Sequence, residues 1–328
     1  MSCRDVVVVG GSAGGVEAAR EFIGGLPGDL PAAVLVVVHM PAGVRSALPQ
    51  ILDRCGALPA SPAEHGQPLK PGHVYVGVPD HHLLIREDTI RLSRSARQNR
   101  MRPAVDALFR SAARWTGPRT IGAVLSGALD DGAAGLAAIR ARGGVAVVQD
   151  PGDAIFDGMP RSALAAVDGD AVLGSPGQLA ARITELVQQQ VTWPSEPADR
   201  DLILETEMAE HDHPNGRERP GRPAGLGCPE CNGGLSIVGR SGTEHFHCHV
   251  GHTYSPQTLL AAQREKVEAA LWTAASFLEE QAIIHQHLAA RASHTDATIT
   301  ADNQRAAAHE ALRAADTVRR HAGSPATG

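Results

Sequence analysis

Short apolar runs alternate with alanine-rich amphipathic stretches along the first 190 residues of the chain. The apolar runs are rich in β-branched residues, as in VVVV (6–9) and AVLVVV (33–38), and a stretch with helical periodicity such as VEAAREFIGGL (16–26) follows. This order of strand, helix and strand is typical of parallel βαβ units, in which helices cover both faces of the sheet. We therefore predict an α/β domain over residues 1–190, built on a doubly wound and mainly parallel sheet.

A different pattern interrupts this rhythm between residues 60 and 93. Short alternating runs such as HVYVGV (73–78) and HLLIR (82–86) are separated there by Gly and Pro residues that are typical of turns. This pattern predicts a small antiparallel excursion from the doubly wound core.

The composition changes again beyond the predicted α/β domain. Residues 191–224 are rich in Pro, Glu, Asp, Arg and Gly and hold too few apolar residues to form a core, so we expect a linker. A compact segment rich in Cys and His follows at 225–255, and then a helix-forming run at 256–292. The final residues, 293–328, fit either a helix or a disordered tail.

The run 256–292 has the periodicity of an amphipathic helix. One broad apolar face would contain Leu259, Val267, Leu271, Phe277, Leu278 and Ile284. A helix of this length with one apolar face is suited to packing against another helix. We therefore expect it to mediate self-association or binding to helices of a partner.

Composition and charge narrow the classes of function. The net charge is −6 and only 3% of the residues are aromatic, which disfavours binding to nucleic acid, by charge or by base stacking. The N-terminus lacks the apolar core of a signal peptide, and no window approaches the ~18 apolar residues that a membrane helix needs. We expect a cytoplasmic protein that does not insert into a membrane.

The segment GGSAGG (10–15) directly follows the first apolar run. Glycine-rich turns after a first strand often bind phosphate, but a dinucleotide fingerprint needs glycine where this chain has Ser12, and no lysine of the Walker type lies near Gly15. The segment does match G-x-S-x-G, a strand-to-helix turn that exposes the serine oxygen above the sheet. We expect the next helix to begin near Ala13 and to direct its N–H groups at this position. The motif alone leaves Ser12 equally open to the roles of nucleophile and tight-turn residue.

A serine nucleophile needs a base, and His39 is placed to supply it. His39 follows the apolar run 33–38 just as Ser12 follows 6–9, so both belong to the same edge of a parallel sheet. A lone strand-end histidine is more often a structural residue, but its place at a second strand end favours catalysis. The histidines of the antiparallel excursion do not obviously share that edge; they are His65, His73, His81 and His82.

A carboxylate that orients the histidine is expected at a third strand end. The segment LSGALDDG (125–132) offers Asp130 and Asp131 there. An aspartate at this point also suits the N-cap of the following helix. Capping and catalysis are compatible if the two aspartates divide these tasks.

Several segments of the chain, taken in order, resemble one protein family over roughly residues 6–186. They are GGSAGGVEAA, VVVHMP, PGHVYVGVPDHH, NRMRPAVDALF, LSGALDDGAAGL and GMPRSA. Together they resemble the catalytic domain of the receptor protein-glutamate methylesterase of bacterial chemotaxis, which removes methyl groups from glutamate side chains of chemoreceptors. The resemblance implies that Ser12 is the nucleophile, His39 the general base and Asp131, rather than Asp130, the residue that orients the histidine.

The reaction that this resemblance implies is acyl transfer without a catalytic cofactor. His39 would accept the proton as Ser12 attacks a glutamyl methyl ester, methanol would leave, and water would then hydrolyse the glutamyl-enzyme. We expect the backbone N–H of Ala13 and one near Ala128 to form the oxyanion hole. Family members commonly carry methionine at the position of Ala128, and some relatives also deamidate receptor glutamine.

The best-known form of this family has an N-terminal receiver domain that blocks the site until it is phosphorylated. In this chain the first catalytic strand is expected to begin at Asp5. We therefore expect no regulation by phosphorylation within the same chain, and expect another chemosensory signalling protein or the C-terminal region to take that role.

The five cysteines are unevenly placed and odd in number, which favours a metal site over a disulfide framework. Cys228 and Cys231 form a C-x-x-C knuckle, and the segment CHVGH (248–252) follows at a spacing typical of zinc ribbons. We predict a structural zinc held by Cys228, Cys231, Cys248 and His252. The other histidines that could replace His252 are His245, His247 and His249. The module and the helix after it resemble C-terminal extensions of some methylesterase homologues that lack a receiver domain.

Two functions remain open from the sequence. The first is a serine esterase acting on glutamyl methyl esters of chemoreceptors. The second is a non-catalytic zinc-ribbon protein that serves as a scaffold in chemosensory signalling. Three strand ends that supply Ser, His and Asp favour the esterase.

Overall fold

The computed structural model describes residues 2–193, 197–210, 218–239, 242–293 and 298–322. The chain divides into two compact units, Met1–Leu259 and Leu260–Gly328, which are described separately below.

A seven-stranded sheet forms the centre of the first unit, in the order β10-β9-β8-β2-β3-β5-β4, and all its paired strands are parallel. The strands are β2 (Val6–Gly11), β3 (Ala33–Val38), β4 (Ala60–Pro62), β5 (His73–Val76), β8 (Thr120–Val124), β9 (Val145–Gln149) and β10 (Val172–Gly174). From β2 the chain builds outward through β3 and later returns to β8 on the other side. The point of reversal lies beside β2, which is where open α/β sheets bind ligands.

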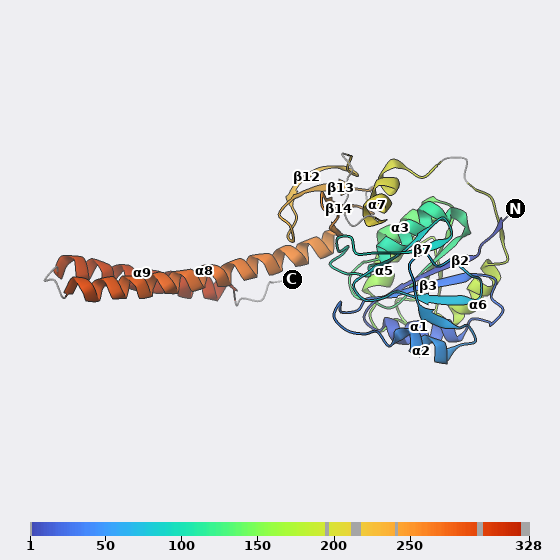
Figure 1. Cartoon of the computed structure of the whole chain (residues 1–328), viewed down its shortest axis with the longest axis horizontal. Helices are drawn as coiled ribbons and strands as arrows, with labels where there is room; N and C mark the ends of the chain where they lie inside the picture. Colours follow the sequence, from blue (N-terminus) through green and yellow to red (C-terminus); the bar gives the residue numbers. More distant parts are fainter. Residues whose placement is uncertain (1, 194–196, 211–217, 240–241, 294–297, 323–328) are drawn as a thin grey trace. The chain divides into compact units, whose positions relative to one another are not determined.

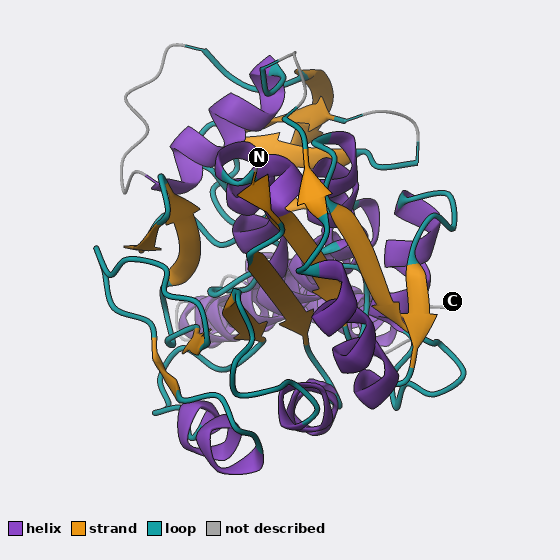
Figure 2. Cartoon of the chain, turned by 90° about the vertical axis from the view of Figure 1, so that its right-hand side faces the viewer, coloured by secondary structure: helices purple, strands orange, loops and turns teal. Residues whose placement is uncertain are grey.

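Helices cover both faces of the sheet, as the sequence predicts (Figure 2). One face packs against α1 (Gly15–Gly24), α2 (Leu48–Cys55) and α6 (Pro176–Leu186). The other packs against α3 (Val105–Trp115), α4 (Ala133–Ala141) and α5 (Gly158–Ala166). Because both faces are covered, every residue of β2 and β3 is buried, which explains their unbroken runs of valine.

The antiparallel excursion is smaller than predicted. A hairpin of β6 (His82–Arg86) and β7 (Thr89–Ser93) is antiparallel, but β4 and β5 join the parallel sheet. The reason is the burial of β5, whose Val74, Tyr75 and Val76 are fully inaccessible and pair alongside β3. Two small elements complete this region: β1 (Ser2–Cys3) pairs with β11 (Gln190–Val191), and a 3-10 turn η1 spans Gly117–Arg119.

The segment predicted as a linker contains a helix, α7 (Arg200–Glu210), within its described part; residues 194–196 and 211–217 lie outside the described residues. Leu202 and Ala209 are buried in the core of the first unit. Glu205 and Glu210 are also buried, and both contact α3. Glu205 forms an ion pair with Arg110, and Glu210 accepts a hydrogen bond from the Trp115 indole. The sequence did not indicate this helix, because its buried face carries the carboxylates of Glu205 and Glu210 where an amphipathic pattern would have apolar side chains.

The Cys/His segment forms a four-stranded antiparallel sheet, which we call the ribbon. Its strands are β12 (Arg222–Gly227), β13 (Gly234–Val238), β14 (His245–Cys248) and β15 (Thr253–Tyr254). The ribbon belongs to the first unit and is followed at once by the start of α8 (Pro256–Ser293).

The second unit is a helical hairpin of α8 and α9 (Thr298–Ala322), which lie side by side (Figure 1). The seam between them is made of alanines spaced seven residues apart, namely Ala275, Ala282 and Ala289 of α8 and Ala301, Ala308 and Ala315 of α9. Val267, Phe277 and Ile284 of the predicted apolar face lie outside this seam and are exposed, because the seam is formed by small alanines that allow the two helices to approach closely. Among the described helices, none is long and apolar enough to span a membrane.

Candidate active site and metal site

The structure brings Ser12, His39 and Asp131 together at the carboxyl ends of neighbouring strands. Ser12 directly follows β2 and His39 directly follows β3. The Ser12 Oγ lies 3.1 Å from His39 Nδ1, and His39 Nε2 lies 2.6 Å from Asp131 Oδ2. In this chain, therefore, Nδ1 faces the serine and Nε2 faces the aspartate.

Glycines shape the turn that presents Ser12. The Ser12 N–H donates to the Ser126 carbonyl at 3.0 Å, and Gly14 has a left-handed φ of 69°. Helix α1 consequently begins at Gly15, two residues later than predicted. A Cβ on Gly127 would lie 3.0 Å from the Ser12 Cβ and 2.1 Å from the Met159 sulfur, so only glycine fits beside the serine.

Asp131 is held by four donors and is only 2% exposed. Its Oδ2 accepts from His39 and from the Val105 N–H at 2.7 Å, and its Oδ1 accepts from the Asn99 amide at 2.8 Å and the Asp106 N–H at 3.0 Å. Burial would raise the pKa of Asp131, but the hydrogen bond and charge of His39, with the surrounding N–H donors, outweigh it and lower the pKa. Asp131 is therefore ionised and immobilised.

The aspartates do not cap the helix that follows them. The N-cap of α4 is Gly132, which makes no side-chain cap, whereas Asp131 accepts from the first N–H groups of α3. Asp106 of α3 in turn accepts from the Gly135 N–H of α4 at 2.7 Å. Burial and the neighbouring charge of Asp131 raise the pKa of Asp106. Asp131, which precedes α4, therefore caps α3, and Asp106 of α3 caps α4, so the two aspartates 130 and 131 do not divide capping and catalysis as expected.

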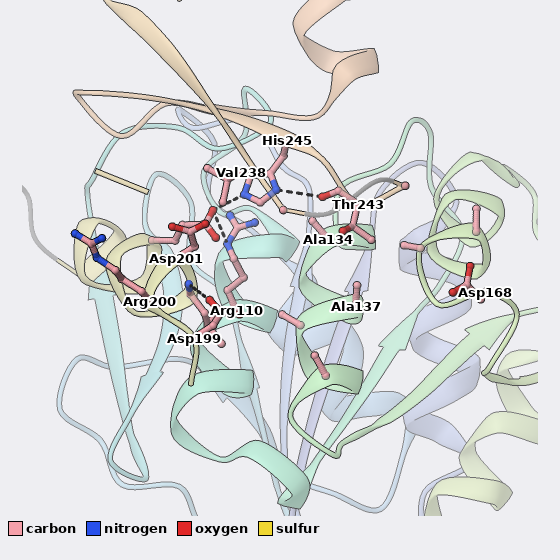
Figure 3. A pocket seen from close by; sticks show the side chains of 18 residues that line it. Arg110, Ala134, Ala137, Asp168, Asp199, Arg200, Asp201, Val238, Thr243 and His245 are labelled. Atoms are coloured by element: carbon pink, nitrogen blue, oxygen red, sulfur yellow. Dashed lines mark hydrogen bonds and ion pairs between the residues drawn. The ribbon is translucent and has the colours of Figure 1, made fainter. Parts of the chain in front are cut away.

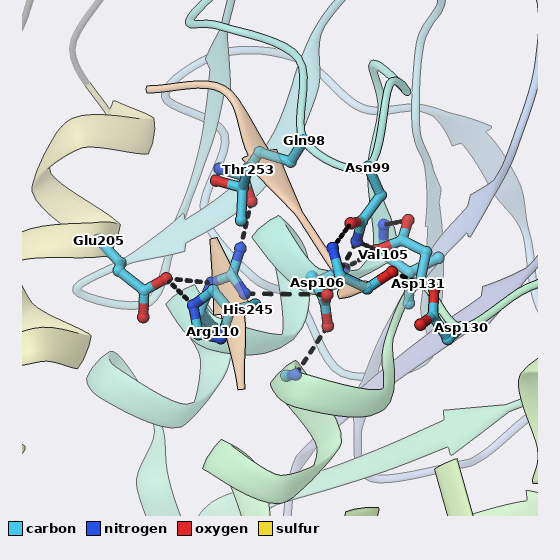
Figure 4. Close-up of polar contacts among 12 residues, drawn as sticks. Gln98, Asn99, Val105, Asp106, Arg110, Asp130, Asp131, Glu205, His245 and Thr253 are labelled. Carbon is cyan, nitrogen blue, oxygen red and sulfur yellow. Dashed lines mark hydrogen bonds and ion pairs between the residues drawn. The ribbon is translucent and has the colours of Figure 1, made fainter. Parts of the chain in front are cut away.

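Asn99 is a site residue that the sequence reasoning missed. It is 5% exposed, has a left-handed φ of 50°, and donates to both Asp131 and Asp106 (Figure 4). The segment NRMRPAVDALF, already singled out for its resemblance, begins with this asparagine. That motif could have drawn attention to Asn99, but its residues do not indicate that Asn99 contacts Asp131, which is distant in the sequence.

The predicted oxyanion donors are available. Within the described residues, the backbone N–H groups of Ala13 and Ala128 have no acceptor. Ala128 is exposed, and Ala13 lies in the turn between Ser12 and the start of α1. A negatively charged oxygen beside Ser12 would find donors of this kind, together with the positive end of a helix.

A basic cavity of about 300 Å³ opens beside His39. Its lining is His39, Met40, Pro41, Ala42, Arg97, Arg100, Met101 and Arg102. Arg102 is fixed by Asp80, whose pKa is lowered chiefly by that hydrogen bond. Three arginines therefore line the approach to the histidine, one of them paired with Asp80.

Cys228, Cys231, Cys248 and His252 form a compact cluster whose ligand atoms all lie within 4.8 Å of one another. The Cys231 and Cys248 sulfurs are 3.7 Å apart, and His252 Nδ1 lies 3.7 Å from the Cys228 sulfur and 3.4 Å from that of Cys248. A tetrahedral ion with metal–sulfur bonds of ~2.3 Å would separate its sulfur ligands by ~3.8 Å. The cluster therefore fits a metal ion of this geometry.

The surroundings of the cluster also fit a metal. His252 Nε2 lies 3.2 Å from the Glu230 carboxylate, which leaves Nδ1 free to face the cysteines. A carboxylate behind a ligating histidine is the usual arrangement at metal sites. In the described chain the alternative histidines stay outside the cluster, because His245 binds Glu205 and His247 binds the Cys248 carbonyl.

Charged side chains fasten the ribbon and α7 to the α/β core. Arg110 of α3 lies between Asp106 and Glu205, and Glu205 also binds His245 of β14 (Figure 4). Burial would lower the pKa of His245, but the Glu205 carboxylate outweighs it and raises the pKa. A pocket of about 620 Å³, lined by both alanines and charged side chains, opens beside this network between α4 and the ribbon (Figure 3).

Taken together, a doubly wound parallel sheet that presents a serine, a histidine and an aspartate in hydrogen-bonding sequence at one edge defines an α/β protein of the serine hydrolase class. The profile of the family described as CheB methylesterase matches residues 7–183. The chain belongs to the CheB methylesterase family.

Similar proteins agree with this assignment. The chain is 39% identical over 180 residues to a protein-glutamate methylesterase/protein-glutamine glutaminase of Paraburkholderia xenovorans, covering 54% of this chain and 49% of the relative. It is 39% identical over 168 residues to one of Pseudomonas aeruginosa, covering 50% and 48%. The crystal structure of the Thermotoga maritima CheB methylesterase catalytic domain matches with a TM-score of 0.54 and 33% identity, covering 56% of this chain and 98% of that one. The chain spans about half the length of the curated relatives it matches.

Proposed function

We propose that the protein is a cytoplasmic serine esterase that hydrolyses glutamyl methyl esters on chemoreceptors and also deamidates receptor glutamine. The hydrogen bonds from Ser12 to His39 and from His39 to Asp131 support this proposal most directly, because they join a nucleophile, a base and a group that orients the base. The names of the relatives supply the substrate class. A scaffold role is not favoured, since a scaffold has no need for a buried ionised aspartate aligned on a histidine.

Each residue has a defined task in the proposed reaction. His39 Nδ1 accepts the Ser12 proton as Oγ attacks the ester carbonyl, while Asp131 holds the Nε2–H and stabilises the imidazolium. The N–H groups of Ala13 and Ala128 stabilise the oxyanion. The His39 imidazolium then donates its proton to the departing methoxide oxygen, or to the amide nitrogen in the deamidation, so that methanol or ammonia leaves. Neutral His39 next accepts a proton from the water that hydrolyses the glutamyl-enzyme.

The test is methanol release from methylated chemoreceptor by the full chain. Ser12→Ala and Asp131→Asn are each expected to lower kcat by about 10⁴-fold or more, because each removes an essential triad function. Ser276→Ala, at an exposed position of α8, is the control for a serine-to-alanine change outside the site. Equal methanol release by Ser12→Ala and the unmutated chain would disprove the esterase mechanism.

We further propose that the cluster of Cys228, Cys231, Cys248 and His252 holds a structural zinc. Three thiolates and an imidazole are the donor set that zinc prefers, and the donor separations support a tetrahedral site. The ion would tie β15 and the two cysteine turns together. Metal analysis of the purified chain should give about one zinc per chain, and Cys231→Ser should lose it.

We propose that the exposed stripe of α8, defined as Leu260, Val267, Phe277, Ile284 and Leu288, packs against a helical partner, either a second copy or a receptor bundle. These side chains are 41–60% exposed and repeat at helical spacing along one face. Ile284→Glu is expected to reduce self-association in sedimentation or binding to receptor helices. Ser276→Glu, on another face of α8, is the control.

A further inference from the structure

The residues that follow the metal ligand His252 reach into the catalytic site. The Thr253 carbonyl accepts from the Asn99 N–H at 2.6 Å, and the Thr253 N–H donates to the Arg97 carbonyl at 3.3 Å. The ribbon strand β15 is thus attached to the loop that carries Asn99. Gln98 and Thr253 form a parallel bridge at the same point.

The side chain of Asn99 joins this attachment to the triad. Its Oδ1 accepts from the Ser255 N–H at 2.9 Å and from the Thr258 hydroxyl at 3.2 Å. Its Nδ2 donates to Asp131 and Asp106. The amide orientation is fixed by its neighbours, because the reversed orientation would place the oxygen against two carboxylates and the NH₂ group against two donors.

A second contact runs in parallel with the first. The Ser255 hydroxyl donates to Asp130 Oδ1 at 2.7 Å, next to the triad aspartate in the chain. Ser255 and Thr258 are buried although they lie at the start of a helix whose later residues are largely exposed. The start of α8 is therefore part of the wall behind Asp131 (Figure 4 shows Asn99 beside Asp131 and Asp106).

The metal cluster fixes the same strand from its other side. Cys248 N–H donates to the His252 carbonyl at 2.9 Å, and His252 N–H approaches the Cys248 sulfur at 3.3 Å. The Tyr254 hydroxyl donates to Glu230 at 2.8 Å and lies 3.5 Å from the Cys228 sulfur. Thr253 and Ser255 face the catalytic site while their neighbours His252 and Tyr254 face the cluster, so the cluster sets the position of the strand.

We propose that metal binding at the cluster positions the triad aspartate through Asn99 and Ser255, so that the rate of serine catalysis depends on metal occupancy although the metal touches no reacting atom. The inference rests on the proposed function. Asn99 and Ser255 are positioning residues in this scheme. Without the metal, β15 loses its anchor, Asn99 loses the Thr253 carbonyl that accepts from its N–H and the two donors to its Oδ1, and Asp131 is held less firmly against His39.

The experiment compares metal-loaded, chelated and zinc-reloaded full chain in two assays. One is methanol release from methylated receptor, analysed as kcat and KM over a range of pH. The other is the rate at which a fluorophosphonate labels Ser12, which reports on activation of the serine without any receptor substrate. Metal content is measured on each sample.

Chelation is expected to lower kcat and the labelling rate by about 10- to 100-fold, the cost of a misplaced catalytic group, while KM changes little; zinc should restore both rates. Cys231→Ser should behave as the chelated chain, and Cys55→Ser, a thiol outside the cluster, as the loaded one. Ser255→Ala should retain its metal but lose part of the rate, whereas Ser276→Ala on α8 should not.

Asn99→Ala gives the decisive comparison, because it removes the link itself. It should lower the labelling rate as chelation does, and chelation should then add little further loss. Either of two results would overturn the proposal: a metal-free chain that is labelled at the full rate, or an Asn99→Ala chain whose labelling rate falls on chelation as much as that of the unmutated chain. If Asn99→Ala fails to fold, the same comparison is made with Ser255→Ala. Metal-dependent labelling without methanol release would instead show that the coupling holds and that the proposed substrate is wrong.

Discussion

The central sheet and the ribbon hold their polar groups in place by different means. Every residue of β2 and β3 is buried between helices, so the strand ends that carry Ser12 and His39 rest on a large apolar core. The ribbon has few large buried apolar side chains, chiefly Leu235, Val238 and Tyr254, and most of β12 is exposed. So little apolar burial offsets little of the conformational entropy of the segment, and the proposed metal ion would supply the missing stabilisation.

The difference teaches that rigidity at this site has two independent sources. Ser12 and His39 are positioned by hydrophobic burial, which responds to temperature and denaturant. Asp131 is positioned in addition by contacts that originate in the ribbon, through Asn99. On the proposal above, the apolar core orders Ser12 and His39, whereas a bound metal ion would help to order the contacts that hold Asp131.

The largest expected effect is that of metal removal on the ribbon alone. Structural zinc sites contribute apparent binding free energies of about 10–16 kcal/mol, so chelation should strip the amides of β13 and β14 of protection against hydrogen exchange. The amides of β2 and β3 should keep theirs. If the ribbon amides stay protected in the metal-free chain, the ribbon is ordered without a metal ion and does not differ from the central sheet in this respect.

A substitution in the apolar core should show the opposite pattern. Leu35 is fully buried at the centre of β3, and Leu35→Ala should lower the free energy of unfolding by about 2–5 kcal/mol through lost burial and a cavity. Denaturant titration measures the loss, and zinc affinity should be unchanged. A fall in zinc affinity as large as the loss of stability would show that the two regions fold as one.

A smaller effect is expected at acidic pH through His82, which anchors the loop that carries Asn99. Its Nε2–H donates to the Ala96 carbonyl and its Nδ1 accepts from the Ala104 N–H, and burial lowers its pKa to about 4. Because the folded pKa lies below the unfolded value of about 6.5, the unfolded chain takes up the proton first, and stability falls as pH drops from about 6.5 towards 4.

Between pH 7 and pH 5 this residue should cost about 2 kcal/mol of unfolding free energy. His82→Gln carries no titrating group at this position. Its unfolding free energy should therefore fall about 2 kcal/mol less between pH 7 and pH 5 than that of the unmutated chain. Denaturant titrations of both chains at the two pH values make the comparison. Identical pH dependence would show that His82 is not held neutral in the folded chain.

The smallest effect is expected in the second unit. Phe277 is 59% exposed on α8, so at protein concentrations too low for self-association Phe277→Ala should change the unfolding free energy by no more than about 0.5 kcal/mol. Ala282→Leu, in the alanine seam, should destabilise the hairpin by overpacking and serves as the contrast. Both are measured by thermal unfolding. A large loss for Phe277→Ala would indicate that this face is covered in solution.

Much of the catalytic edge could be predicted from the sequence because parallel strands end on one side. That rule places Ser12 and His39 beside the pair Asp130 and Asp131, and the family resemblance selects Asp131. The structure has Ser12, His39 and Asp131 in contact. The spacing of the ribbon cysteines likewise predicts the cluster, because few residues separate its ligands and a turn can bring them together.

What the sequence did not indicate depends on contacts between distant segments. Asn99 looks like a loop residue until the chain places Asp131 and Ser255 on either side of it. The helix α7 resembles a linker because its buried Glu205 and Glu210 are stabilised only by partners on α3 and the ribbon. The alanine seam was overlooked because periodicity ranks faces by hydrophobicity, whereas close packing of two helices selects small residues.

The double role of Asp131 bears on how descendants of this chain would diverge. The same carboxylate orients His39 and closes the first turn of α3, so loss of the aspartate harms folding as well as chemistry. Ser12 has no such second duty within the described contacts. In a lineage released from selection for catalysis, the serine would drift first and the aspartate would persist, which makes position 12 a better marker of a working enzyme than position 131.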